Sequence, residues 1–412
     1  MTPTPRLRIL VVTQYFWPES FRINELVSEL VKRGNQVTVL TGRPNYPDGI
    51  VFPDFKASPD NYSNYSGADV VRLPLRPRGR GSLRLVLNYW SFVFWGVLLG
   101  PWLLRGRKYD SIFIFQTAPI TSAIPAILLK WIKKAPLTIW VLDLWPDQLS
   151  SLGVVRSKKI LWLVGQMVRF IYSQCDLILT QSRAFSSQIV RWTHDSAKIK
   201  YFPQWTESEY QRDSVAVEVA DEVRSFGNTF NVMFAGNIGD SQDFPAIIDA
   251  AERLKHRDEI RWLIVGDGRF ADFVKQEIVR RNLNHCVIML GRHPSEKMPS
   301  FFAGASVLLV SLRKEPVFTM TIPGKIQSYL TAGRPIVAML DGEGARVIQE
   351  ANAGLTCPAG DSIALAQCVD ELYAMTVEDR EIFSKNGKKY AKLHFDRQKL
   401  IDQLCEWLPR KA

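Results

Sequence analysis

The sequence is poor in the residues from which disulfide frameworks and metal sites are built. Its five cysteines are scattered over 412 residues, are odd in number and form no CxxC pair. This pattern excludes a disulfide scaffold and a structural zinc site, and it is typical of a reducing compartment. No group of acidic residues has the spacing of a metal site either, so we expect no metal and no other cofactor.

Two further absences narrow the class of protein. No GxGxxG fingerprint follows the first strand-like run, Arg8 to Thr13, which argues against a dinucleotide oxidoreductase. Basic residues lead directly into that run without a small-residue cleavage site, so we expect no secretory signal peptide. The apolar fraction of 46% and the charged fraction of 23% are those of a globular protein, and the length suffices for two domains.

Positive charge is concentrated in the first half of the chain. Residues 1–205 carry 26 Lys and Arg against 12 Asp and Glu, a balance of +14, whereas residues 206–412 carry 26 against 29, a balance of −3. The basic half therefore faces an anionic partner. Its basic residues flank aliphatic and Trp-rich runs rather than forming a polar groove, which favours an anionic membrane surface over nucleic acid.

The first residues predict a parallel α/β sheet. Strand-like runs at Arg8 to Thr13 and Gln36 to Leu40 flank a helical apolar spacing over Phe21 to Lys32, which makes a βαβ unit. Ligands of such sheets bind beyond the carboxyl ends of the strands. The loop after the first strand and the first helical turn offer three polar candidates there: Glu19, Arg22 and Asn24. For Arg22 and Asn24, a solvated helical turn is an equally good explanation.

Residues 72–108 hold an apolar run from Leu85 to Leu104 that lies between Arg84 and Arg105. Twenty residues reach the length of a membrane-spanning helix, but polar residues, glycines and a proline interrupt the run, and both ends are basic. A helix lying in the membrane interface, a buried domain helix and a true span all stay open. Interfacial helices are rich in tryptophan, and the run contains three tryptophans: Trp90, Trp95 and Trp102. This composition favours a helix lying in the membrane interface.

A strand-like run from Leu137 to Leu142 leads into Asp143. An acid that directly follows a central strand lies at the carboxyl edge of the sheet, where it can take part in chemistry. Capping of the following segment is the alternative role. The first sheet then ends near Tyr201, and residues 202–205 are predicted to link two domains.

The second half repeats the strand-and-helix pattern. A run from Phe230 to Ala235 is followed by a turn that contains Gly236, Asn237 and Gly239. Glycines in a strand-to-helix turn let backbone amides approach a phosphate closely.

The segment from Ser311 to Asp361 carries the strongest functional signal. Lys325 follows Pro-Gly and opens a helical run, so its ammonium and the free amides of the helix start face the same point. A diphosphate is the ligand that such a site binds well. Glu343 opens the next helix, where a carboxylate can bind sugar hydroxyls.

The order of this segment resembles the donor-binding half of the family 4 glycosyltransferases of the GT-B fold. It consists of a phosphate loop, a helix, an Ala-Gly-x-Pro strand, a Gly-Glu turn and Pro-Ala-Gly-Asp. Residues 18–24 and 41–49 (PESFRIN and TGRPNYPDG) resemble a subgroup that transfers N-acetylfucosamine and related deoxy-sugars in bacterial surface polysaccharide assembly. The resemblance extends over nearly the whole chain.

The chain departs from the family at three places. It lacks the Gly-Gly pair of the first loop, and Leu142 stands where relatives have a histidine before Asp143. The two positions of the family's Glu-x7-Glu pair are Met320 and Ser328, neither of which is acidic. Ser328 stays a donor-side candidate, Glu343 is expected to take over the hydroxyl contacts, and no nucleophile is assigned.

The resemblance implies two Rossmann-like domains that face each other across a cleft. Residues 1–205 form the acceptor-side, membrane-facing domain, residues 206–394 bind the donor, and residues 395–412 form a helix that packs back on the first domain. It also implies that Arg292 and His293 contact the nucleotide base, with a UDP-sugar favoured over a GDP-sugar as donor. Lys325 and Asp143 are the expected catalytic residues.

The implied enzyme is a metal-independent, retaining glycosyltransferase. It transfers a HexNAc or deoxy-HexNAc to a polyprenol-diphosphate-linked saccharide and is cytoplasmic, peripheral on the inner face of the cell membrane. A nucleotide-sugar epimerase of the same fold would leave residues 72–108 without a purpose. A non-catalytic, membrane-tethered subunit that binds nucleotide sugars would account for the missing carboxylates.

Overall fold

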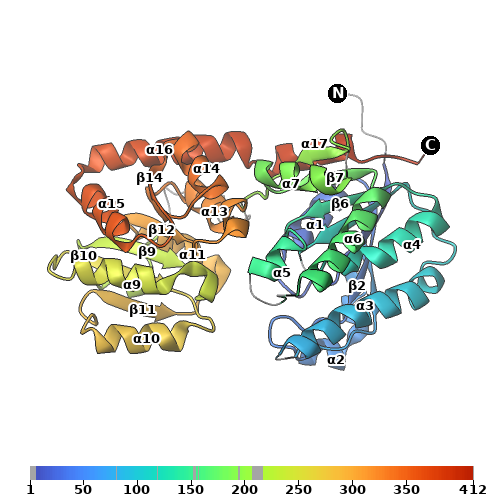
Figure 1. The fold of residues 1–412 in the computed structure, drawn as a ribbon, viewed down its shortest axis with the longest axis horizontal. Helices are drawn as coiled ribbons and strands as arrows, with labels where there is room; N and C mark the ends of the chain where they lie inside the picture. Colours follow the sequence, from blue (N-terminus) through green and yellow to red (C-terminus); the bar gives the residue numbers. More distant parts are fainter. Residues whose placement is uncertain are drawn as a thin grey trace. The chain divides into compact units, whose positions relative to one another are not determined.

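The computed structural model describes residues 6–79, 81–117, 119–151, 155, 157–193, 195–206 and 217–411. The chain divides into two compact units (Figure 1). The first unit consists of Met1–Pro203 and Gln398–Ala412, and the second consists of Gln204–Arg397.

The first unit is an eight-stranded sheet with helices on it. Its strands are β1 (Arg8–Val12), β2 (Gln36–Gly42), β3 (Asn64–Tyr65), β4 (Ala68–Leu73), β5 (Ser111–Gln116), β6 (Leu137–Val141), β7 (Leu177–Thr180) and β8 (Ile199–Tyr201). Its helices are α1 (Arg22–Lys32), α2 (Pro53–Ala57), α3 (Ser82–Leu103), α4 (Ala123–Lys133), α5 (Asp147–Ser151), α6 (Lys158–Gln174), α7 (Arg183–Thr193) and, from its second residue on, α17 (Arg397–Trp407).

The order of the first sheet is β3-β4-β2-β1-β5-β6-β7-β8. Neighbouring strands are parallel except for the β3–β4 pair. Strands β5 and β6 are buried along their whole length, as expected where helices cover both faces of a parallel sheet. The chain leaves β1 toward β2 on one side and returns to β5 on the other, so the carboxyl ends of β1 and β5 form a topological switch point, the usual ligand position in such sheets.

The second unit is a six-stranded parallel sheet. Its strands are β9 (Phe230–Ala235), β10 (Ile260–Val265), β11 (Val287–Gly291), β12 (Val307–Ser311), β13 (Ile336–Met339) and β14 (Gly354–Cys357). Its helices are α8 (Asp221–Arg224), α9 (Phe244–Arg253), α10 (Ala271–Arg280), α11 (Met298–Ala303), α12 (Pro316–Thr319), α13 (Gly324–Ala332), α14 (Glu343–Ala351), α15 (Ser362–Ala374) and α16 (Val377–His394).

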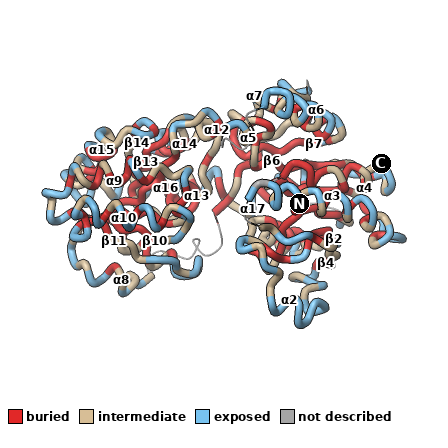
Figure 2. Tube along the Cα trace, turned by 60° about the horizontal axis from the view of Figure 1, so that its bottom comes forward, coloured by how far each residue is buried: buried red, intermediate tan, exposed pale blue. Residues whose placement is uncertain are grey.

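The order of the second sheet is β11-β10-β9-β12-β13-β14, with the switch point between β9 and β12. One hydrophobic core joins the sheet to α9, α10 and α15, and the other joins it to α11, α13, α14 and α16. Figure 2 shows the resulting layers, with buried strands inside and helices whose outer faces are exposed.

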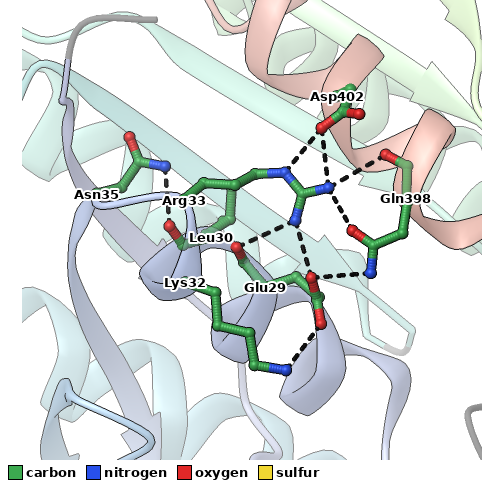
Figure 3. A network of polar contacts seen from close by, with 7 residues as sticks. All are labelled: Glu29, Leu30, Lys32, Arg33, Asn35, Gln398 and Asp402. Carbon is green, nitrogen blue, oxygen red and sulfur yellow. Dashed lines mark hydrogen bonds and ion pairs between the residues drawn. The ribbon is translucent and has the colours of Figure 1, made fainter. Parts of the chain in front are cut away.

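A polar network fastens the last helix, α17, to the first helix, α1 (Figure 3). The Arg33 guanidinium donates to the Asp402 carboxylate at 2.8 Å and to the Gln398 amide oxygen at 2.7 Å. It also donates to the Glu29 carboxylate at 2.8 Å, and Gln398 donates to the same carboxylate at 3.1 Å. The C-terminal helix is therefore a part of the first unit.

The strand predicted at Phe230 to Ala235 has its observed ends, and the other predicted strands differ from the observed ones by one or two residues at their ends. The region after β14 consists of two helices, α15 and α16, because Thr376 interrupts the run and its hydroxyl accepts from the Asp379 amide at 3.1 Å. Strands β3 and β4 and the short helix α2 were not predicted, since their segment is polar and has little periodicity.

Candidate active site

The loop after β9 and the start of α13 meet at the switch point of the second sheet. Gly236 directly follows β9, and Lys325 is the second residue of α13. The loop is held from the β12 side as well, because the Ser311 hydroxyl donates to the Gln242 carbonyl at 2.6 Å and the Arg313 amide donates to the Ser241 carbonyl at 2.9 Å. The two segments that the sequence analysis assigned to phosphate binding thus lie together.

Gly236 makes room for the lysine. A Cβ at this position would lie 2.6 Å from Cε and 3.4 Å from Nζ of Lys325, and the backbone φ of +139° is one that L side chains rarely adopt. A similar restriction applies one strand away, where a Cβ on Gly266 would lie 1.9 Å from the Gly236 carbonyl oxygen. The glycines therefore determine how closely the loop approaches Lys325.

The ammonium of Lys325 is enclosed by few polar groups. Nζ donates to the side-chain oxygen of Gln242 and lies 4.4 Å from the centre of the Phe234 ring. Burial lowers the pKa of the lysine to about 7, because desolvation penalises the charged form. An anion beside Nζ would favour the ammonium again, so the site is electrostatically suited to a diphosphate.

Two helix starts flank the lysine. Neither α13 nor α14 has a side chain that caps its first turn, so their terminal amides are not bound by capping side chains. A Cβ on Gly344, in the first turn of α14, would lie 3.2 Å from Cδ of Pro323, the residue that precedes α13. The positive ends of both helices and Lys325 converge within a short distance, which favours an anionic ligand.

Glu343 lies in the first turn of α14, as expected. Both of its carboxylate oxygens accept hydrogen bonds from Arg346, at 2.9 and 3.3 Å, and Arg346 also bonds Glu350. A sugar hydroxyl that binds Glu343 would therefore share the carboxylate with Arg346.

The other donor-side candidates differ in exposure. Asn237 is exposed beside the loop glycines, and its amide nitrogen lies 2.6 Å from the position of a Cβ on Gly239. Ser328 lies one turn after Lys325 and is buried; its hydroxyl is 3.5 Å from the Gly324 carbonyl.

Arg292 and His293 follow β11 at the same edge of the sheet. Arg292 is exposed. The His293 ring lies 4.6 Å from the Phe301 ring centre, its Nε2 is 3.0 Å from the Leu290 carbonyl and its Nδ1 is 3.8 Å from the Glu222 carboxylate. The histidine therefore packs on α11, and the arginine is the more accessible of the two.

In the first unit, Glu19 holds the loop after β1 together. Its carboxylate accepts from the backbone amides of Phe16, Asn45 and Tyr46 at 3.1, 2.8 and 2.7 Å. Burial raises its pKa to about 7, and the three amides partly offset this effect. The side chain is 2% exposed, so its contacts are those of a loop anchor.

Asn24 has a similar role, and Arg22 lies beside it. The Asn24 side chain accepts from the Trp17 amide at 3.1 Å and donates to the Glu19 carbonyl at 2.7 Å. Arg22 is half-buried at the start of α1. The loop itself thus uses the polar atoms of Asn24 that were predicted to reach a ligand.

Asp143 lies in the loop after β6. Burial raises its pKa to about 7, and the Gln148 amide, which donates to Oδ1 at 3.2 Å, partly offsets the shift. The Tyr89 hydroxyl of α3 is close enough to be influenced by its charge. A carboxyl group with a pKa near neutrality is suited to accept a proton from an acceptor hydroxyl.

Helix α3 is the one helix of the described residues with the length and apolar composition to cross a membrane, over Leu83–Leu103. It packs on the first unit by one side, since Phe92 is fully buried and a Cβ on Gly96 would lie 2.6 Å from Pro125. The opposite side is exposed, including Trp90 at 50% and Trp102 at 68%.

The other predicted membrane residues lie on the same helix or directly after it. Arg84 and Arg105 are exposed near its two ends, whereas Trp95 is only partly exposed and packs edge-on against Phe94. Helix α4 packs against both α3 and α6, as Figure 1 shows, and extends the apolar surface. Most of the large apolar side chains that the described residues leave exposed belong to these three helices.

The sequence analysis did not identify two residues that the structure brings to these sites. Gln242 bonds Lys325 across 83 positions of the chain, and no local pattern marks that contact. Asn88 is fully buried, and its oxygen accepts from Gln14 at 2.8 Å and from the Tyr15 hydroxyl at 3.1 Å. Its only signal was a polar residue inside an apolar run.

The chain is similar to known proteins over most of its length. Residues 229–375 match the glycosyl transferases group 1 family, and residues 20–205 match the glycosyl transferase 4-like domain. The chain is 24% identical to WbjE of Pseudomonas aeruginosa, assigned as a glycosyltransferase, over 75% of this chain and 79% of that protein. It is 24% identical to WcaI of Escherichia coli K12, assigned as a colanic acid biosynthesis glycosyl transferase, over 79% and 82%.

The fold is that of solved glycosyltransferases. The crystal structure of Anabaena HepE in complex with UDP and glucose superposes with a TM-score of 0.69 at 16% identity and covers 97% of this chain and 99% of that one. The two family matches together cover most of both units, and the two parallel sheets with a returning C-terminal helix are the GT-B architecture. The chain belongs to the GT-B glycosyltransferases of family 4.

Proposed function

We propose that the protein transfers an N-acetylhexosamine or deoxy-N-acetylhexosamine from a UDP-sugar to a polyprenol-diphosphate-linked saccharide, with retention of anomeric configuration. The product would enter surface polysaccharide biosynthesis. The supporting observation is the diphosphate site of the second unit, in which Lys325, the Gly236 loop and two uncapped helix starts converge.

Cleavage of the sugar–phosphate bond leaves a nucleoside diphosphate whose bridging oxygen gains negative charge. Preorganised positive groups at that oxygen stabilise the transition state more than they stabilise the bound substrate, and this difference lowers the barrier. Lys325 and the amides of α13 and of the Gly236–Gly239 turn provide such groups from the chain itself. We therefore propose that the reaction needs no resident metal or other cofactor.

The nature of the donor rests on relatives and on resemblance. HepE binds UDP and glucose, which favours a UDP-sugar over a GDP-sugar here. Resemblance to family 4 supports retention, and resemblance to the deoxy-sugar subgroup supports the sugar class. WcaI is assigned to colanic acid biosynthesis, which supports a role in a surface polysaccharide.

The acceptor class rests on the exposed apolar surface of α3, α4 and α6. Exposed basic residues surround it and form no ion pair with another described residue: Arg84, Arg105, Lys108, Lys134, Lys158 and Lys159. An apolar surface with a basic rim matches an anionic bilayer, in which aromatic and aliphatic side chains enter the interface. Because its other side packs on the first unit, α3 would lie in the interface plane of the inner leaflet.

The direct test is a transfer assay with the purified full chain. UDP- and GDP-sugars are supplied with and without a polyprenol-diphosphate-linked saccharide, and the products are identified by mass spectrometry. We expect UDP release and a lengthened saccharide only when the lipid is present. Isomerisation of the sugar nucleotide without lipid, or no reaction with any donor, contradicts the proposal.

The variant Lys325→Met links that activity to the site. It should abolish most of the transfer while circular dichroism and the melting temperature stay close to those of the wild type. Unchanged turnover would remove Lys325 from the mechanism.

A further inference from the structure

The Lys325 side chain is held in place along its whole length. A Cβ on Gly236 would lie 2.6 Å from its Cε, so the aliphatic part lies against the backbone of that turn. Nζ lies 4.4 Å from the centre of the Phe234 ring and donates a hydrogen bond to the side-chain oxygen of Gln242. Among the described residues, Gln242 accepts the one hydrogen bond that Nζ forms. The glutamine therefore determines where the ammonium lies.

Gln242 is itself fixed at its side chain and at its backbone. Its amide nitrogen donates to the Ser241 hydroxyl at 3.2 Å. Its carbonyl accepts from the Ser311 hydroxyl at 2.6 Å, and its backbone N–H donates to the Gly239 carbonyl at 3.1 Å. Ser311 is fully buried at the end of β12, the strand beside β9. Because the nitrogen of the side-chain amide is bound to Ser241, its oxygen is presented to Lys325.

The turn that contains Gln242 is anchored on both sides. Before the glutamine, Asp240 forms an ion pair with Arg313, and the Arg313 amide donates to the Ser241 carbonyl at 2.9 Å. After it, Asp243 has a left-handed φ of +51°, a conformation that a residue with a side chain keeps only where its surroundings hold it. The sheet and its loops therefore set the position of the Gln242 amide before any ligand binds.

No carboxylate among the described residues forms an ion pair with Lys325. The acidic side chains of the neighbouring segments are bonded to other groups: Asp240 and Glu315 to Arg313, Asp243 to the Ala246 amide, Asp267 to the Gly268 amide, Asp341 to the Ala359 amide and Glu343 to Arg346. The other titratable group of α13, the Tyr329 hydroxyl, bonds the backbone of Ala235. Burial lowers the pKa of Lys325, and no charged neighbour offsets it. The ammonium is thus left to pair with a ligand.

We propose that Gln242 is the positioning residue of Lys325 at the diphosphate site. Its neutral amide oxygen holds the ammonium in place, so an arriving diphosphate meets a cation that no internal acid has neutralised. A carboxylate at this position would form an internal ion pair that competes with the diphosphate, and an apolar side chain would leave the ammonium without an acceptor. This inference rests on the proposed function and deepens it, because it assigns the residue that prepares Lys325 for the donor.

The first test titrates Lys325 without nucleotide. The full chain and its variants Gln242→Met and Gln242→Glu are labelled with trace acetic anhydride from pH 5 to pH 11, and mass spectrometry of the Lys325 peptide gives the titration midpoint. The wild-type midpoint should lie near the pKa of about 7. Gln242→Met should lower it by about one pH unit, since the charged form loses an acceptor. Gln242→Glu should raise it by at least about one, since a carboxylate favours the ammonium.

The second test measures UDP binding by calorimetry from pH 5.5 to pH 9. Affinities are compared with that of the wild type at the same pH, which removes the ionisation of UDP itself. The deficit of Gln242→Met should grow by up to about tenfold as the pH rises, because its ammonium is lost at a lower pH. Gln242→Glu should bind UDP at least about tenfold more weakly at pH 7, because the carboxylate repels the diphosphate. This deficit should shrink as the pH rises to 9, because the lysine stays charged.

Gln349→Met and Gln349→Glu are the matched controls. Gln349 lies on α14 of the same unit, is exposed, and donates from its amide to a hydroxyl, that of Thr356, at 2.7 Å. Neither control should change the Lys325 midpoint or the affinity for UDP. Melting temperatures show whether each variant is folded. Gln242→Glu keeps the size of glutamine, and it decides the test alone if Gln242→Met does not fold.

The outcomes separate this inference from the proposed function. Equal Lys325 midpoints in the wild type and in the Gln242 variants overturn the positioning role, whatever the transfer assay shows. A loss of UDP affinity that is the same at every pH, with unchanged midpoints, also overturns it, because a merely structural residue has this effect. Midpoints that shift as expected, in a protein that binds no UDP, would contradict the proposed function alone.

Discussion

The affinity for UDP should fall as the pH rises above 7. In the unliganded protein, burial lowers the pKa of Lys325 to about 7, so at higher pH the lysine is mostly neutral. A diphosphate beside Nζ favours the ammonium, and binding must then take up a proton. If the pKa in the complex returns to at least the ordinary ~10.4 of a lysine, the affinity falls by about 50-fold between pH 7 and pH 9, which is ~2.3 kcal/mol.

Isothermal titration calorimetry of UDP from pH 6 to pH 9 measures this dependence. Repeating the titration in two buffers of different ionisation enthalpy counts the protons taken up, and we expect a value near one at pH 8 to 9. Lys325→Met should bind weakly at every pH without proton uptake. A dissociation constant that is flat from pH 7 to pH 9 in the wild type would refute the view that a neutral lysine is recharged by the ligand.

Three further predictions concern Gly236 beside Lys325, the polar network that joins Arg33 to α17, and the exposed apolar surface of α3. Gly236→Ala should cost about 1–3 kcal/mol of stability and weaken UDP binding, because the new Cβ meets Lys325 at a strained φ. Melting and UDP-binding assays measure both effects. In the same assays the control Gly227→Ala, at φ +63° with open space around it, should leave UDP binding unchanged. Arg33→Met should cost about 1–3 kcal/mol in urea unfolding, since it leaves the nearly buried Glu29 carboxylate with fewer donors. Burial opposes ionisation of Glu29, but bonds from Lys32, Arg33 and Gln398 outweigh it and lower its pKa, so this stabilisation is present above the ordinary glutamate pKa and disappears as the pH falls through the lowered value; the exposed Lys385→Met, whose partner Glu381 is exposed as well, should have no such effect. Replacing Trp90, Phe94 and Trp102 by glutamine should reduce binding to anionic vesicles by more than ~10-fold in a sedimentation assay. The control replaces three exposed residues of the second unit: Val279, Ile363 and Ile382. An equal loss of vesicle binding in this control would contradict the interfacial role of α3.

Much of the fold could be predicted from the sequence because strands buried on both faces form uninterrupted apolar runs. The strand Phe230–Ala235 was predicted with its observed ends. The break between α15 and α16 has a local signal too, because Thr376 with Glu378 and Asp379 has the composition of a helix start. Strand β4 was missed because Ala68–Leu73 has only a short alternating pattern.

The sequence marks a candidate residue only where a residue type limits the local backbone. Gly236 and Lys325 were singled out because glycine turns and helix starts leave local signals, and the structure brings the two together. Pairings over long distances leave none. The contact of Gln242 with Lys325 depends on which strands are neighbours in the sheet. For Asn24 the sequence left a ligand donor and a solvated helical turn equally open, and the structure shows its side chain bonded within the loop.

The polar network between Arg33 and α17 affects how the chain folds during synthesis. The partners of Arg33, Gln398 and Asp402, follow it by 365 and 369 positions, so the ribosome makes the whole second unit before they exist. The first part of that unit ends at Pro203 and its second part begins at Gln398, so at the usual ~5–20 residues per second the first unit waits roughly 10–40 s for its last helix. During that interval the C-terminal end of α1 lacks these partners, and a nascent chain that stops near residue 397 would carry a complete second unit and an unfinished first unit.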